Sequence, residues 1–205
     1  VKAYLQTGST ITNNIGVTGN YDKGSFRLSL SNMTNKGVMP NTKTQQKSVN
    51  FNSQYNITNR ITVSVNASYI NTYNPNKANT TGSSSVLNSL LFNMPSNLQP
   101  LGDMKSYWLD GFEGSRQNGA IMKDNGVDVS ENNPWWTTYE KIHRFSRDNY
   151  FGKLQLNWQF NDHLSLLLRT GMENVKENYE LRKSWGEKGD PYGQYVSGNN
   201  SSIEA

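Results

Sequence analysis

Three acidic residues in the middle of the chain are the first candidates for a metal site. Asp124, Asp128 and Glu131 lie close together in the sequence, and carboxylate oxygens are the ligands that Ca²⁺ prefers. Their spacing misses the calcium-loop pattern, in which the acidic ligands, a glycine and a final glutamate have fixed places. A solvated acidic loop accounts for them better, so we predict no metal site.

The histidine and cysteine content argues against catalysis. His143 and His163 are isolated, and neither belongs to a His-Glu-x-x-His pattern. The chain has no cysteine, which excludes a thiolate metal site and a disulfide framework. It also has neither a phosphate-binding Gly-Lys-Ser/Thr loop nor a nucleophile-elbow pattern. The sequence therefore predicts a protein that is not an enzyme, with no cofactor and no catalytic residue.

Large aromatic residues in polar surroundings are the candidates for binding. Trp and Tyr provide rigid contact area together with a polar group, which suits sugar rings. The candidates for contact with a substrate or a partner are Trp108, Trp135, Trp136, Tyr139, Trp185 and Tyr192. The alternative, which we favour, is that these residues anchor their own loops, because long functional loops need internal anchors.

Strict alternation of apolar and polar residues predicts the elements that position these side chains. In the clearest segment, Leu154, Leu156 and Trp158 face one way and the polar residues between them face the other. A period of two is the signature of a strand with one apolar and one polar face. The pattern predicts six strands in three hairpins with very short turns, near residues 9–21, 25–33, 47–57, 61–73, 147–160 and 163–175.

Much longer loops follow the second and third hairpins, at residues 74–146 and 176–205. Short turns on one side and long loops on the other are typical of an up-and-down transmembrane barrel. One short amphipathic helix is predicted in the first loop, where apolar residues recur at helical spacing before Pro95. These residues are Val86, Leu87, Leu90 and Leu91.

The composition fits a sheet whose second face meets water. Only 34% of the residues are hydrophobic and the mean hydropathy is −0.77, and no run approaches the roughly 18 apolar residues of a membrane helix. Aromatic residues mark both ends of the expected strands, as in the two girdles of a membrane barrel. They are Tyr21, Phe26, Tyr55, Trp158 and Phe160 at the short turns, and Tyr69, Tyr73 and Tyr150 near the long loops. The net charge of +4 is dispersed, which argues against nucleic acid as a partner.

Six strands are too few to close, because membrane barrels begin at about eight strands and lipid does not tolerate open edges. The predicted fold class is therefore all-β: an antiparallel up-and-down transmembrane β-barrel segment with long extracellular loops and one short loop helix. Strand-like sequence begins almost at Val1 without a signal peptide, so we expect a piece of a larger chain. Candidates to face the lumen or a plug are Arg27, Lys153, Arg169 and Glu173, which are equally well explained as solvated wall residues.

Three segments resemble the SusC/RagA family of TonB-linked outer-membrane transporters. Residues 19–37 (GNYDKGSFRLSLSNMTNKG) are similar to a strand, turn, strand and loop of that family, and residues 154–171 are similar to another of its strand pairs. Asn133-Pro134-Trp135-Trp136 resembles the family's Asn-Pro-Tyr-Trp stretch, with Trp135 in place of the usual Tyr.

The resemblance implies an outer-membrane barrel of about 22 strands around a plug. It also implies energy from TonB, a SusD-like surface lipoprotein as partner, and import of an oligosaccharide or a peptide through the outer-membrane lipid. The plug and the TonB box are absent from these residues. Trp135 and Trp136 are then expected to fix their loop onto the barrel rim or to contact the lipoprotein. The alternatives are a glycan-binding β-sandwich module and a passive porin.

Overall fold

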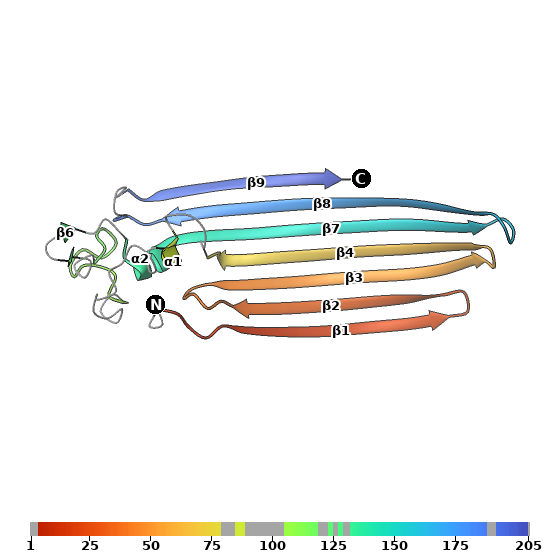
Figure 1. Ribbon diagram of the computed structural model, residues 1–205, viewed down its shortest axis with the longest axis horizontal. Helices are drawn as coiled ribbons and strands as arrows, with labels where there is room; N and C mark the ends of the chain where they lie inside the picture. Colours follow the sequence, from red (N-terminus) through yellow and green to blue (C-terminus); the bar gives the residue numbers. More distant parts are fainter. Residues whose placement is uncertain are drawn as a thin grey trace.

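The computed structural model describes residues 4–78, 85–88, 105–118, 123–124, 127–128, 132–187 and 192–204. Seven strands form one antiparallel sheet in the order β1-β2-β3-β4-β7-β8-β9 (Figure 1). Their bounds are Ser9–Tyr21, Gly24–Lys36, Lys43–Thr58, Ile61–Asn76, Lys141–Gln159, Ser165–Lys183 and Gln194–Glu204. The seven strands lie across the sheet in the order in which they follow one another along the chain, so the topology is up-and-down. The sheet is open, with β1 and β9 as its edges within the described residues.

Shorter elements lie at one end of the sheet (Figure 1). They are the helices α1 (Val86–Asn88) and α2 (Pro134–Glu140) and the small hairpin of β5 (Lys123–Asp124) with β6 (Val127–Asp128). Among the described residues, no helix has the length and apolarity needed to cross a bilayer. We call this the loop end of the sheet, and the opposite end, with the tight hairpin turns, the turn end.

The three predicted short turns are present, and all lie at the turn end (Figure 1). They join Tyr21 to Gly24, Thr58 to Ile61, and Gln159 to Ser165. A side chain at Gly24 would collide with the carbonyl oxygen of Gln54 on the neighbouring strand. Glycine is therefore required there by close approach of the backbone.

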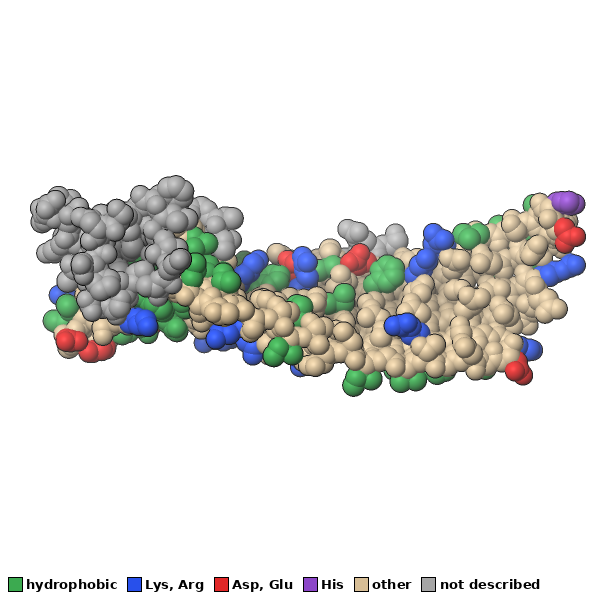
Figure 2. Space-filling model, turned by 60° about the horizontal axis from the view of Figure 1, so that its bottom comes forward, with side chains coloured by type: hydrophobic (Ala, Val, Ile, Leu, Met, Phe, Trp, Pro, Cys, Tyr) green, Lys and Arg blue, Asp and Glu red, His purple; other side chains and the backbone are tan. Residues whose placement is uncertain are grey.

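The register gives the sheet one continuous apolar face, because directly opposed residues of antiparallel strands point to the same side. One row across the sheet reads Ile15, Leu30, Val49, Tyr69 and Tyr150, and the next reads Val17, Leu28, Phe51, Ala67 and Gly152. Nearer the turn end, Val63, Leu156 and Leu168 form another row, and Ile61, Trp158 and Leu166 form the last. Most of these side chains are exposed, Ile15 by 69%. In Figure 2, hydrophobic side chains project along the lower margin of the sheet.

The opposite face is polar and hydrogen-bonded across the strands. Arg27, Asn52, Asn66 and Lys153 form one row of it, and the Asn66 amide donates to Asn52 Oδ1 at 2.6 Å. Arg169 and Glu173 lie on this same face, where Arg169 donates to Gln155 at 3.2 Å and Glu173 accepts from Asn149 at 2.9 Å. All four candidates for facing a lumen or plug therefore share one side of the sheet.

The buried core of the described residues is at the loop end, away from the middle of the sheet. It consists of Tyr4, Met39, Val86, Trp135 and Trp136, each less than a tenth exposed. Segments that are far apart in the sequence thus meet where the long loops leave the strands.

Several elements differ from the sequence-based expectation. Residues 176–205 were expected as a loop, but β8 continues to Lys183 and β9 follows, which makes seven strands where six were expected. Strand β7 begins at Lys141, inside the expected loop 74–146, and helix α2 precedes it. The expected helix begins at Val86, but Leu90, Leu91 and Pro95 lie outside the described residues.

Candidate substrate-contact site at the loop end

Helix α2 begins as its sequence dictates. Asn133 is the N-cap, and its side-chain oxygen accepts hydrogen bonds from the backbone of Trp135 at 2.9 Å and of Trp136 at 3.4 Å. Pro134 occupies the first helical position, where its fixed φ is favourable and its missing N–H costs nothing. Because α2 leads directly into β7, its aromatic side chains are carried at the loop end of a long strand.

One side of α2 is buried against distant segments. Trp136 is completely buried, and Trp135 packs edge-on against Tyr4 with 5.1 Å between ring centroids. The hydroxyls of Tyr4 and Thr138 form a short hydrogen bond, and burial raises the pKa of Tyr4 to about 12. The carbonyl of Thr138 also accepts from the amides of Asn41 at 3.0 Å and Asn76 at 3.1 Å. Helix α2 therefore joins the N-terminal segment, the β2–β3 loop and the end of β4.

An aromatic groove opens beside this helix. Tyr107 stacks on Tyr139 at 5.9 Å with nearly parallel rings, and Tyr139 stacks on Trp135 at 6.2 Å. The ammonium of Lys105 lies 5.5 Å from the centre of the Trp135 ring. The groove has a volume of about 500 Å³, and its lining is Tyr4, Leu5, Gln6, Pro40, Lys105, Tyr107, Trp135 and Tyr139. We refer to it as the rim groove.

The rim groove combines flat apolar surfaces with a few polar groups. Burial, together with the charge and hydrogen bonding of the neighbouring Glu140 carboxylate, raises the pKa of Tyr107, so its phenol stays protonated. The amide of Gln6 is already used, since it donates to the carbonyls of Gly37 and Met39. Lys105 adds a positive charge. Such a surface suits a sugar ring or a peptide side chain lying against aromatic faces.

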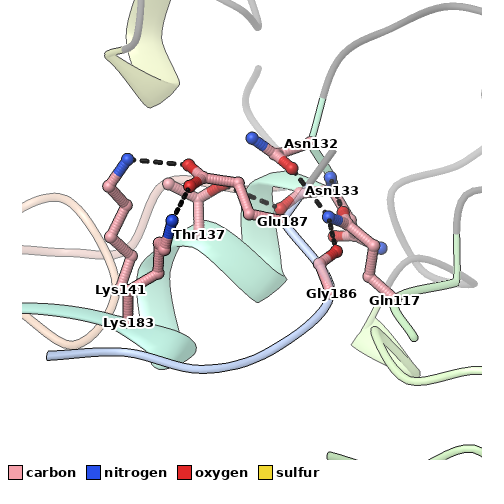
Figure 3. A network of polar contacts seen from close by, with 8 residues as sticks. All are labelled: Gln117, Asn132, Asn133, Thr137, Lys141, Lys183, Gly186 and Glu187. Carbon is pink, nitrogen blue, oxygen red and sulfur yellow. Dashed lines mark hydrogen bonds and ion pairs between the residues drawn. The ribbon is translucent and has the colours of Figure 1, made fainter. Parts of the chain in front are cut away.

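A polar network joins the segments around the start of α2 (Figure 3). The Gln117 amide donates to Asn132 Oδ1 and to the carbonyl of Gly186, both at 2.7 Å, and its oxygen accepts from the backbone of Asn133 at 2.6 Å. Residues 105–118, the start of α2 and the segment after β8 are thereby joined. The loop end is consequently a connected structure, although its parts come from distant positions.

Glu187 forms the charged part of the same network. Its two carboxylate oxygens pair with the ammonium groups of Lys141 at 2.8 Å and Lys183 at 2.9 Å (Figure 3). Burial by itself raises the pKa of Glu187, but the hydrogen bonds and charges of the two lysines outweigh it, and the net shift is downward. The carboxylate form is therefore the one that the folded loop end stabilises.

The structure brings some of the predicted aromatic residues together and leaves others apart. Trp135 and Tyr139 line the rim groove, and Trp108 packs edge-on against the buried Trp136 at 6.3 Å. Trp185 is 56% exposed and contacts Tyr192, away from the groove lining. Sequence reasoning missed Tyr4, Lys105 and Tyr107. Only the proximity of Lys105 and Tyr107 to Trp108 in the sequence hinted at the last two.

The possible metal ligands form no cluster in the part of the chain that the structure describes. No group of three His, Asp or Glu side chains with metal-binding geometry occurs among those residues. Glu131 lies outside them, while the backbone of Asp124 and Asp128 belongs to the small β5–β6 hairpin. His143 is half-buried near the start of β7, and its backbone N–H donates to Asn76 Oδ1 at 3.0 Å.

The chain is similar to a solved transporter in fold. No protein-family model and no curated protein sequence matches it. Two structures of the RagAB peptide importer, in its "open-open" and "closed-closed" states, each superpose with a TM-score of 0.70 at 13% identity over 98% of this chain. The chain spans 21% and 22% of the chains that it matches. At this identity the likeness establishes the fold alone. The fold that is shared corresponds to about a fifth of each larger chain.

Proposed function

We propose that this chain is an arc of an outer-membrane barrel that imports a nutrient. The observation that carries the proposal is the distribution of charge over the two faces of the sheet. From the turn end up to the row of Tyr69 and Tyr150, the charged residues of β1–β8 are Arg27, Lys153, Arg169 and Glu173, and all of them lie on the polar face. The other face carries no charged side chain in this zone, and apart from Ser53, Thr170 and Asn174 its residues are apolar or glycine, as suits contact with lipid.

The height of the apolar zone agrees with a bilayer. Its two ends are marked by Tyr150 on β7 and by Phe160, which directly follows the last residue of β7, and the two lie ten positions apart. At about 3.4 Å per residue this is roughly 34 Å along the strand, which a tilt of about 40° reduces to about 26 Å. The lipid-facing band of outer-membrane barrels is about 25 Å tall. Aromatic pairs lie at both ends, Trp158 with Phe160 and Tyr69 with Tyr150.

The open sheet supports a larger barrel, and the likeness to RagAB supports a SusC-like transporter. In our proposal, a SusD-like lipoprotein covers the loop end, and TonB supplies energy through a plug that lies outside these residues. The polar face then lines the lumen, where Arg27, Lys153, Arg169 and Glu173 are available to pair with the plug. The rim groove is the proposed contact for an oligosaccharide or a peptide, and the importer that shares this fold favours a peptide.

Two other functions make different predictions. A glycan-binding β-sandwich needs a second sheet over the apolar face, and no described residue covers Ile15, Val17 or Leu154, which are all about half exposed or more. A passive porin needs no energy, so its uptake would continue after the proton gradient is dissipated.

The test uses the complete protein in its native membrane. We expect uptake of fluorescent oligopeptides or oligosaccharides that stops with a protonophore. Tyr139→Ala and Lys105→Ala should each reduce apparent affinity by about twofold to tenfold, since aromatic and cation–π contacts contribute roughly 0.5–1.5 kcal/mol. Trp185→Ala is the matched control, because it removes an exposed aromatic residue outside the groove. Uptake that survives the protonophore would support the porin instead.

A further inference from the structure

The apolar face ends at the row of Tyr69 and Tyr150, and the next row on the same face is polar. The rings of Tyr69 and Tyr150 are 4.8 Å apart. Since every second residue of a strand shares a face, the next row on this side can be read from the register. It is entirely polar and consists of Asn13, Asn32, Lys47, Asn71, Asp148 and Lys176. We call it the boundary row.

A groove lies across this boundary on β1, β2 and β3. Its volume is about 360 Å³, and its lining is Asn13, Ile15, Leu30, Ser31, Asn32, Lys47, Ser48 and Val49. Ile15, Leu30 and Val49 belong to the last apolar row, whereas Asn13, Asn32 and Lys47 belong to the boundary row. The groove is thus apolar on its membrane side and carries amides and an ammonium group on the other.

The positive charge at this groove is available. Asp148 is the one carboxylate of the boundary row, and it already accepts hydrogen bonds from Tyr69 and Asn71, both at 2.7 Å. The ion pairs among the described residues are all formed by other lysines and arginines, so neither Lys47 nor Lys176 forms an ion pair within the described part of the chain. Both lysines are exposed. An anion from outside the chain would therefore balance the positive charge of these two lysines.

We propose that the groove binds the phosphorylated headgroup of an outer-leaflet lipid. The phosphate contacts the Lys47 ammonium, the amides of Asn13 and Asn32 donate to its oxygens or to the adjoining sugar, and the first part of an acyl chain lies on Ile15, Leu30 and Val49. This inference rests on the proposed membrane orientation, in which the loop end faces outward. Lysine at this depth is where anionic headgroups are expected.

The test measures lipid binding to the complete protein in detergent by native mass spectrometry. The probes are bis-phosphorylated lipid A, the same lipid without its phosphates, and inorganic phosphate. Lys47→Gln should weaken binding of the phosphorylated lipid about fivefold, the worth of one lysine near an anionic surface. Lys47→Arg should restore most of the affinity. Lys153→Gln, which removes a lysine from the polar face, should leave lipid binding unchanged.

Two results would overturn the inference. One is equal binding of phosphorylated lipid by Lys47→Gln and the unaltered protein, with both migrating as folded barrels on unheated gels. The other is binding of inorganic phosphate that competes fully with the lipid, which would identify a free-anion site. Membrane fractionation separates these failures from that of the proposed function: a protein absent from the outer membrane refutes both, whereas an embedded, active importer with unchanged lipid binding refutes only the lipid site.

Discussion

Placing an arginine on each face of the same strand tests the two-faced sheet directly. Leu156 and Asn157 are neighbours on β7, near the middle of the apolar zone, and point to opposite sides. Leu156 opposes Val63 and Leu168 on the apolar face, whereas Asn157 opposes Thr62 and Leu167 on the polar face. An arginine at either position thus lies on the same strand and at almost the same depth, but on opposite faces of the sheet.

The expected cost follows from the position of each residue. Leu156 is four positions from Phe160 and six from Tyr150, the two ends of the apolar zone, and therefore lies close to its midplane. An arginine on the lipid face at the midplane costs about 2–4 kcal/mol, and a lumen-facing arginine has water nearby. We expect Leu156→Arg to destabilise the protein by about 2–4 kcal/mol and Asn157→Arg by less than about 1 kcal/mol.

The assay is denaturant titration of the complete protein during folding into lipid vesicles, followed by tryptophan fluorescence and by mobility on unheated gels. The ratio of the two costs is decisive, because both variants add the same side chain to the same strand. Equal costs would refute the assignment of faces. A larger cost for Asn157→Arg would mean that the polar face is the buried one.

Three further predictions concern the loop end and a turn. Asn133→Ala removes the N-cap of α2 and should destabilise it by about 1–2 kcal/mol, seen as faster proteolysis before β7; an unchanged rate would contradict the capping role. The pKa of Glu187 is lowered on folding, so the stability that its carboxylate contributes is fully present above the unfolded pKa of 4.5. This stability is lost as the pH falls through the lower pKa of the folded state. Amide exchange in residues 184–187 should therefore accelerate only at acidic pH, and Glu187→Gln should show fast exchange at neutral pH as well. Gly24→Ala should destabilise the β1–β2 hairpin because its Cβ meets the Gln54 carbonyl, whereas Gly152→Ala, with nothing within 4 Å, serves as the control; equal effects would exclude this steric cause.

The sequence predicted the parts of the fold that are decided locally. The three hairpins follow from period-two alternation and turn residues, and the register confirms the shared apolar face. Strand β9 carries no such pattern: Ser-Gly-Asn-Asn-Ser-Ser lies in its middle, and pairing with β8 makes it a strand. Helix α2 did have a local signal, since Asn133 and Pro134 are an N-cap and first-turn pair, but the long-loop assignment obscured it.

The rim groove was beyond sequence reasoning because its walls come from separate segments. Tyr4 precedes the first strand, Lys105 and Tyr107 lie in the long loop, and Trp135 belongs to α2. No local pattern records that these residues meet. Their contact depends on the up-and-down sheet, which returns every long connection to the same end.

Charge placement above the boundary row locates the rim groove relative to the proposed bilayer. Beyond this row, ion pairs occur on both faces of the β7–β8 hairpin: Arg144 with Glu180 on the continuation of the apolar face, and Arg147 with Glu177 on the polar one. Charged pairs on both sides of a sheet require water on both sides. The strands therefore extend past the proposed bilayer as a water-exposed collar. Helix α2 and the rim groove lie on this collar, so the proposed substrate contact is made in water, before entry into the barrel.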